Sequence, residues 1–104
     1  MPAMPMEQQD LQALHRVRER LVKARTALVN EMRGLLSEYG IILLQSITKF
    51  RTAVVRQLED ERAKLSSLST EVFWHLYEEF LALGHRVVYD NEKLQALARA
   101  HPAR

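Results

Sequence analysis

The sequence predicts an all-α protein built as an antiparallel helical hairpin. Two long segments repeat apolar residues at alternating spacings of three and four, which is the pattern of a coiled-coil seam. Only three glycines and three prolines occur in 104 residues, too few for the many turns of an all-β fold. The chain is 47% hydrophobic with a net charge of +2, which excludes a disordered tail and a histone-like DNA wrapper.

The length predicts one small domain, so we treat residues 1–104 as a single helical coiled-coil domain. The absence of cysteine excludes a disulfide scaffold and favours a reducing compartment, so we expect a cytoplasmic protein. The start of the chain has no charged segment followed by an apolar run, and the longest aliphatic stretch is only Ile41 to Leu44. We therefore expect neither a signal peptide nor a membrane partner.

The first helix is predicted over about residues 7–39. Pro5 is tolerated at the edge of a helix but not inside it, and Gly40 suits the left-handed residue that follows many helices. Arg18 and Arg25 occupy positions in the seam where apolar residues are expected. The other seam residues of this helix are Leu11, Leu14, Leu21, Leu28, Met32, Leu35 and Tyr39.

A short connecting helix is predicted over about residues 47–62, after an apolar connector at 41–48, because Phe50, Val54 and Leu58 are four residues apart. A third helix is predicted over about residues 68–100, with Ser66 and Ser67 as capping residues and His101-Pro102 as its end. Its seam consists of Phe73, Leu76, Phe80, Leu83, Val87, Asp90, Leu94 and Leu97.

The two long helices align as a hairpin when the residue numbers of facing pairs sum to 108. Arg18 then faces Asp90, and such a buried pair specifies register more than it adds stability. A slip of one turn is the alternative, and Arg25 faces Leu83 without a polar partner. The expected hairpin core consists of Leu14, Leu21, Leu28, Leu35, Phe73, Leu76, Phe80 and Leu83.

Apolar residues outside the seam predict self-association. Val22, Val29 and Leu36 form a second column on the first helix, and Trp74, Leu81 and Val88 form a stripe almost opposite the seam of the third. A lone hairpin would expose much of this surface, which monomers usually avoid, although the connecting helix could cover part of it. We therefore expect a homodimer or higher homo-oligomer that forms a helical bundle, with the third-helix stripe as its interface.

Arg16, Arg20 and Lys23 share the helix face opposite the seam. Their spacing suits contact with a phosphate backbone, and a merely solvated helix face is the alternative. Residues 1–56 hold nine basic and five acidic residues, whereas residues 57–104 hold six and eight. This asymmetry favours a nucleic-acid-facing first half.

No residue pattern predicts chemistry within this chain. The histidines His15, His75, His85 and His101 show no paired spacing and have no cysteine nearby, so no metal site is expected. No glycine-rich phosphate loop occurs, and Ser66, Ser67 and Ser69 are expected to cap a helix. We therefore predict no catalytic, cofactor-binding or metal-binding residue, no cofactor and no small-molecule substrate.

Three runs carry a family resemblance: EQQDLQALHRVRERLV at 7–22, RTALVN at 25–30 and RGLLSEYGI at 33–41. They resemble the central coiled-coil region of the DEDD-type insertion-sequence transposases, bacterial recombinases that use a bridge RNA encoded by their own element. Residues 76–79 and 94–103 are similar to the same region in order and spacing. The chain departs from that pattern at Leu44 and Ser46, where proline and glycine are common, and at Gly84, where an acid is usual.

The resemblance implies a part of a larger enzyme. In such transposases a RuvC-like domain carries four magnesium-binding acids, a later domain carries a nucleophilic serine, and the coiled coil between them assembles subunits and helps hold RNA and DNA. The acids would precede Glu7 and the serine would follow Arg104. We therefore expect a noncatalytic oligomerisation module that supports DNA recombination with RNA or DNA contact, and not an enzyme in itself.

Two other hypotheses remain. The chain could be a small adaptor that binds a partner protein's helix through its apolar stripe, with no link to nucleic acid. It could also be a transposase fragment that retains recombination activity. The Met-Pro-rich start is compatible with a truncated reading frame and with an expressed fragment.

Overall fold

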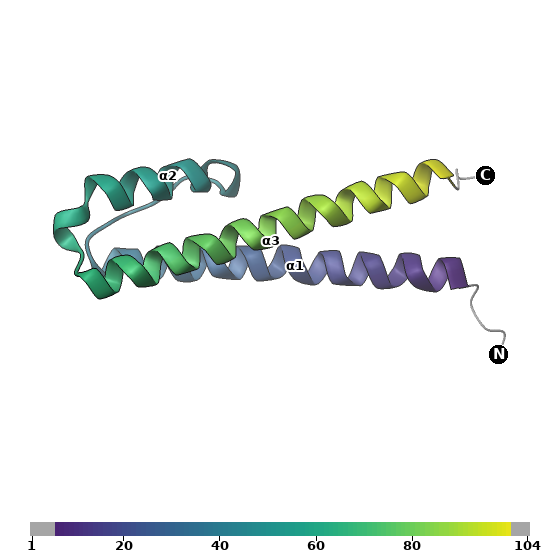
Figure 1. Cartoon of the computed structure of the whole chain (residues 1–104), viewed down its shortest axis with the longest axis horizontal. Helices are drawn as coiled ribbons and strands as arrows, with labels where there is room; N and C mark the ends of the chain where they lie inside the picture. The colour runs from purple at the N-terminus through teal and green to yellow at the C-terminus, as the bar shows by residue number, and fades with distance from the viewer. Residues whose placement is uncertain (1–5, 101–104) are drawn as a thin grey trace.

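The computed structural model describes residues 6–100 and is built from helices. α1 (Met6–Glu38) and α3 (Ser67–Ala100) lie side by side and run in opposite directions, while α2 (Ile47–Asp60) packs at the closed end (Figure 1). A short 3₁₀ helix, η1 (Arg62–Lys64), leads into α3. Residues 6–100 contain no strand, so the predicted all-α hairpin is confirmed. The dimeric bundle stays a prediction.

The helix bounds differ slightly from the sequence-based ranges. α1 ends at Glu38 and α2 at Asp60, one and two residues before the expected ends, and α3 begins one residue early. Met1-Pro2-Ala3-Met4-Pro5 and the predicted end at His101-Pro102 lie outside the described residues. Within the described part, no helix combines the length and apolar character needed to cross a lipid bilayer.

Gly40 ends α1 in the left-handed conformation that the sequence predicts, with φ of 78°. Its amide donates to the carbonyl of Ser37 at 3.0 Å, and the amide of Ile41 donates to the carbonyl of Leu36 at 3.0 Å. These two bonds form a Schellman motif, in which the buried Ile41 and Leu36 supply the accompanying apolar pair. The motif turns the chain back along the hairpin.

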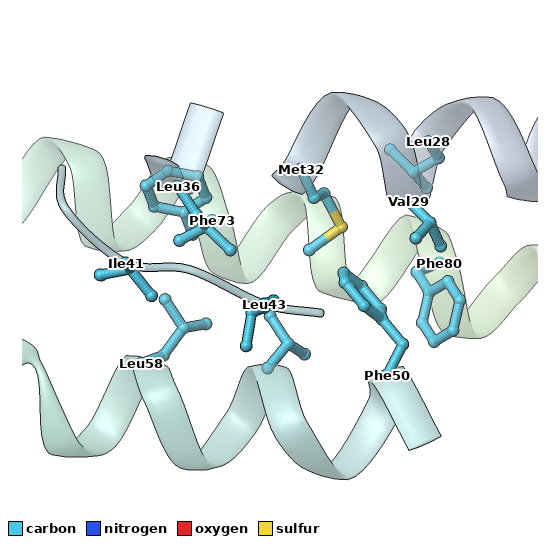
Figure 2. Close-up of a cluster of buried hydrophobic side chains, with 11 residues drawn as sticks. Leu28, Val29, Met32, Leu36, Ile41, Leu43, Phe50, Leu58, Phe73 and Phe80 are labelled. Carbon is cyan, nitrogen blue, oxygen red and sulfur yellow. The ribbon is translucent and has the colours of Figure 1, made fainter. Parts of the chain in front are cut away.

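The connector that follows Gly40 forms an inner layer of the protein. Ile41 and Leu43 are 1% and 3% exposed, whereas Ile42 and Leu44 are 60% and 86% exposed. This alternation is that of an extended chain with one face buried. Figure 2 shows the connector running between α2 and the α1–α3 pair, with Ile41 and Leu43 in the core. Ile41 and Leu43 therefore add a layer of apolar side chains to the core.

Arg33 of α1 ties the connector to α2. Its Nη2 donates to the carbonyl of Gln45, and its guanidinium carbon lies 5.5 Å from the centroid of the Phe50 ring. A guanidinium over an aromatic face is attracted by the ring quadrupole. This single side chain therefore fixes both the end of the connector and the beginning of α2.

Ser66 caps the N-terminus of α3, as expected. Its Oγ accepts a hydrogen bond from the amide of Ser69 at 3.1 Å, and the Oγ of Ser69 accepts one from the amide of Ser66 at 2.8 Å. The reciprocal bonds form a capping box with serine in the place usually taken by glutamate. Ser67, the other expected capping residue, is the first residue of the helix.

The fully covered core lies in the closed half of the hairpin, where α1, the connector, α2 and α3 meet. Within this core the rings of Phe50 and Phe80 pack edge to face at 5.4 Å. Figure 2 shows this cluster. Its buried members are Leu28, Val29, Met32, Leu36, Ile41, Leu43, Phe50, Val54, Leu58, Phe73 and Phe80.

The open half of the hairpin, residues 6–20 and 84–100, contains only two helices. Leu11, Leu14, Leu94 and Leu97 are partly buried there. Four of the expected core residues, Leu21, Leu28, Phe73 and Phe80, are buried, while Leu14, Leu35, Leu76 and Leu83 are partly buried. Val29 and Leu36 are buried in the single chain, because α2 and the connector add layers that the hairpin alone lacks.

Candidate interaction surfaces

Arg18 forms a polar contact across the hairpin, but with the neighbour of the expected residue. Its Nε donates to Oδ1 of Asn91 at 2.5 Å, whereas Asp90 was expected to face it. Both Arg18 and Asn91 are partly buried, so the guanidinium reaches the edge of the seam and keeps part of its charged end in water. The difference of one residue corresponds to a rotation of about 100° around α3.

Asp90 lies inside the seam. The residue is 2% exposed, and its Oδ2 has no hydrogen-bond partner among the described residues. The Nε of Arg25, also in the seam, is likewise buried without a partner. The hairpin therefore carries a polar layer at its middle that is only partly satisfied.

The apolar stripe of α3 is divided by α2. Trp74 and Leu81 are partly buried against the core cluster, and the rings of Trp74 and Tyr77 meet edge to face at 5.6 Å. Tyr77 shares a surface hollow with residues of α2, which shows that α2 borders this stretch. Val88, the third predicted interface residue, is 54% exposed. The stripe thus continues uncovered toward the open end.

The cations predicted on α1 are all exposed. Arg16, Arg20 and Lys23 lie on the surface of the helix, and Lys23 Nζ lies 3.4 Å from Glu19 Oε1. Both partners of this ion pair are mostly in solvent, where such a pair contributes little to stability. The pairing nevertheless reduces the local positive charge.

A second cationic surface lies on α2, outside the predicted site residues. Lys49, Arg51 and Arg56 are exposed, and α2 has no acidic residue before Glu59. The signal was present in the run TKFRTAVVR at 48–56. These charges belong to the basic first half of the chain, but a cationic face was predicted on the first helix alone.

No site for a metal is assembled within residues 6–100, where no three histidine, aspartate or glutamate side chains gather around one point. His15, His75 and His85 are exposed and far apart in the sequence, and His101 lies outside the described residues. Two open hollows lie on the surface of α2.

The sequence of this chain is similar to those of known transposases. The chain is 41% identical over 96 residues to the transposase of insertion sequence element IS1111A of Coxiella burnetii, covering 92% of this chain and 26% of that protein. It is 40% identical over 102 residues to a candidate family 20 transposase of Pseudomonas aeruginosa, covering 94% and 29%. A candidate transposase of Sinorhizobium fredii is 32% identical over 99 residues, covering 92% and 25%.

These similarities confirm the resemblance to insertion-sequence transposases along nearly the whole chain. The chain spans between a quarter and a third of the length of the relatives it matches. No protein-family model and no solved structure matches it. The hairpin therefore corresponds to one segment of an insertion-sequence transposase.

The expectation that the protein is not an enzyme is wrong. The relatives that match almost the entire chain are named transposases, and transposases are enzymes. The expectation rested on motifs absent from these 104 residues.

Proposed function

We propose that the hairpin joins subunits of an insertion-sequence transposase in a DNA recombination complex. The observation that carries this proposal is the uncovered end of the α3 stripe. Val88 and its neighbour Tyr89 are each 54% exposed, directly beyond the stretch that α2 borders. An apolar stripe that continues past its intramolecular cover is typical of a protein interface.

The open half of the hairpin supports a second copy as the partner. Two helices alone leave seam residues such as Leu14 and Leu94 partly exposed to water. Four helices bury such residues in a shared core, and a two-fold axis brings the same surface from both copies together. The predicted interface residues Trp74, Leu81 and Val88 then divide their roles. The first two pack against the core of their own chain, and Val88 contacts the partner.

Light scattering over a concentration series tests this role with the variant Val88→Glu. Val88 makes little contact within its own chain, so the variant should keep its helical circular dichroism while its average mass falls toward that of a monomer. A charge placed in a buried apolar contact should weaken dimerisation at least about tenfold.

Arg86→Glu is the matched control, because Arg86 is exposed on another face of α3 and receives the same new side chain. Its mass should match that of the unmodified chain. An unmodified chain that is monomeric at all concentrations, or equal masses for Val88→Glu and the unmodified chain, would contradict the proposed interface.

A second candidate role is contact with RNA or DNA through Arg16, Arg20 and Lys23. All three are exposed on one face of α1, and Lys23 is the member that has an ion-pair partner in the structure. Lys and Arg side chains bind phosphates mainly by charge and release counterions as they do so.

Replacement of all three α1 cations by glutamate should weaken binding of RNA or DNA and flatten its salt dependence. Each lost phosphate contact lowers the slope of log affinity against log salt by about 0.7 to 0.9. Fluorescence anisotropy at two salt concentrations measures both quantities. Unchanged affinity at both concentrations would remove this role from α1.

A further inference from the structure

We propose that the outer surface of α2 is a binding site for the phosphate backbone of a nucleic acid. We call this surface the α2 cationic face and define it by Lys49, Arg51, Thr52 and Arg56. The choice of a nucleic acid over another polyanion rests on the proposed role in a recombination complex. The site itself rests on four observations, which concern charge, placement along the helix, shape and support.

The first observation is the local charge. From Ile47 to Leu58, α2 carries three cations and no acid. All three cations are exposed, and none of them forms an ion pair within the described part of the chain. On α1, in contrast, Lys23 is paired with Glu19. Unpaired cations on one short helix give a stronger local potential than the same number among acids.

The second observation is the order of charges along α2. Lys49 and Arg51 lie near its N-terminus, and Glu59 and Asp60 lie at its C-terminus. A helix is stabilised by the reverse order, because its dipole is positive at the N-terminus and negative at the C-terminus. Helix stability therefore does not explain this arrangement. A departure from a local stability rule is expected where residues serve binding.

The third observation is the shape of the surface. A shallow hollow of about 360 Å³ lies on this side of α2, lined in part by Thr48, Lys49, Thr52 and Arg56. A second hollow, of about 500 Å³, is lined by Arg51 and again by Thr52 and Arg56, with Glu59 and Asp60 at its end toward the C-terminus of α2. Both are open, so they suit a chain that crosses the surface better than an enclosed small molecule.

The spacing of the cations fits successive phosphates. Lys49 and Arg56 are seven residues apart and lie on the same side of the helix, about 10 Å apart along its axis. Phosphates of one strand of duplex DNA rise by about 3.4 Å each along the duplex axis, so this distance corresponds to about three of them when α2 lies parallel to that axis. Thr52 lies between these two cations along the helix, and its hydroxyl group can donate a hydrogen bond to a phosphate oxygen.

The fourth observation is the rigid support beneath the face. The buried side of α2, which lies opposite Lys49 and Arg56 and next to Arg51, carries Phe50, Val54 and Leu58 at 0%, 0% and 2% exposure. Figure 2 shows Phe50 and Leu58 in the core. The cations are therefore presented by a helix that is already anchored, so less conformational freedom of the backbone is lost on binding. The acids at 59–61 would repel phosphates and so set one end of the contact.

The test is a triple variant in which Lys49, Arg51 and Arg56 are each replaced by glutamine. Binding to a labelled single-stranded RNA and to a labelled duplex DNA is measured by fluorescence anisotropy between about 50 and about 200 mM salt. We expect at least a tenfold loss of affinity for one or both probes. The slope of log affinity against log salt should fall by about 2 to 3.

The matched control replaces Arg62, Arg86 and Lys93 by glutamine, which removes the same charge from exposed positions elsewhere. Its affinity should remain within about threefold of that of the unmodified chain. Circular dichroism should show both variants folded, because none of the six side chains is buried. The variant Lys49→Arg with Arg56→Lys keeps the charge and should keep binding.

Each outcome decides the proposal. Loss of binding to RNA alone or to DNA alone supports it and names the source of the phosphates. Equal losses of affinity in the α2 variant and in the control would overturn it. Loss of binding only when the α1 cations are replaced would also overturn it, but this outcome would leave nucleic-acid contact by the hairpin intact. An unmodified chain that binds neither probe would overturn both. Displacement of the probe by polyglutamate at equal charge would assign the face to an acidic protein instead.

Discussion

At the scale of single residues, Asp90 is the side chain that fits its surroundings least well. It is 2% exposed in the seam between α1 and α3, and its Oδ2 has no hydrogen-bond partner among the described residues. A buried polar group without a partner costs about 1 to 3 kcal/mol of stability. The expected partner, Arg18, bonds instead to Asn91.

We predict that Asp90→Leu raises the free energy of unfolding by about 1 to 3 kcal/mol, because it removes an uncompensated polar group from an apolar layer. Urea denaturation followed by circular dichroism measures this change. Asn91→Leu is the companion variant. It removes the acceptor for Arg18 and should not stabilise the hairpin. A loss of stability in Asp90→Leu would show that the carboxylate has a partner in solution.

Sequence periodicity placed Arg18 and Asp90 in the same seam, but it could not choose between positions 90 and 91. The rule that facing residue numbers sum to a constant describes the position along the helices and not their rotation. Rotation depends on how the side chains of the two helices interdigitate. The ion pair was therefore a reasonable expectation, and the packed helices place Asn91 at the guanidinium instead.

At the scale of elements, the turn at Gly40 controls how the connector enters the core. We predict that Gly40→Ala lowers the free energy of unfolding by about 1 to 2 kcal/mol, because residues with a Cβ disfavour the left-handed conformation. A Cβ at this position would meet Lys64 Nζ only at 3.8 Å, so the cost comes from the backbone. Thermal or urea denaturation measures it.

Gly34→Ala is the control for this prediction. Gly34 lies inside α1, and a Cβ there would meet nothing within 4 Å. Alanine favours the helix over glycine by about 1 kcal/mol, so this variant should be stabilised. The same substitution thus has opposite signs at two positions of one chain. Stabilisation of both variants would mean that the left-handed turn is not maintained in solution.

The helices and their ends were largely predictable from local patterns. Glycine commonly ends a helix and serine commonly begins one, because the left-handed turn and the capping hydrogen bond involve only a few neighbouring residues. Gly40 and Ser66 follow this rule. The connector was different. Its run of aliphatic residues at 41–44 was recognised as apolar. The alternation that buries Ile41 and Leu43 depends on α2 closing over it, and α2 is separated from α1 by the connector itself.

At the scale of the whole molecule, the packing is uneven along the hairpin. The closed half contains α1, the connector, α2 and α3 around side chains such as Met32 and Phe50, both 0% exposed. The open half contains two helices whose seam is only partly covered, and it includes Arg18 and the buried Asp90. Regions with few buried apolar contacts open locally at lower free energy.

We predict that amide hydrogens in residues 8–18 and 90–98 exchange at least about tenfold faster than those in residues 28–36 and 73–80. Hydrogen exchange with mass spectrometry at low protein concentration measures the difference. If a second copy covers the open half, protection there should increase with concentration while protection of the closed half stays constant. Uniform protection at every concentration would contradict an uneven core.

The sequence by itself determined that this protein is a helical hairpin with its seams, its caps and its relation to transposases, because these depend on periodic spacing and on short runs of residues. Only the tertiary structure decided which apolar surfaces stay open, which residue meets Arg18 and where the unpaired cations of α2 lie. Those outcomes depend on the rotation of the long helices and on the path of the connector. Both are set by side chains far apart in the chain that become neighbours only when the core closes.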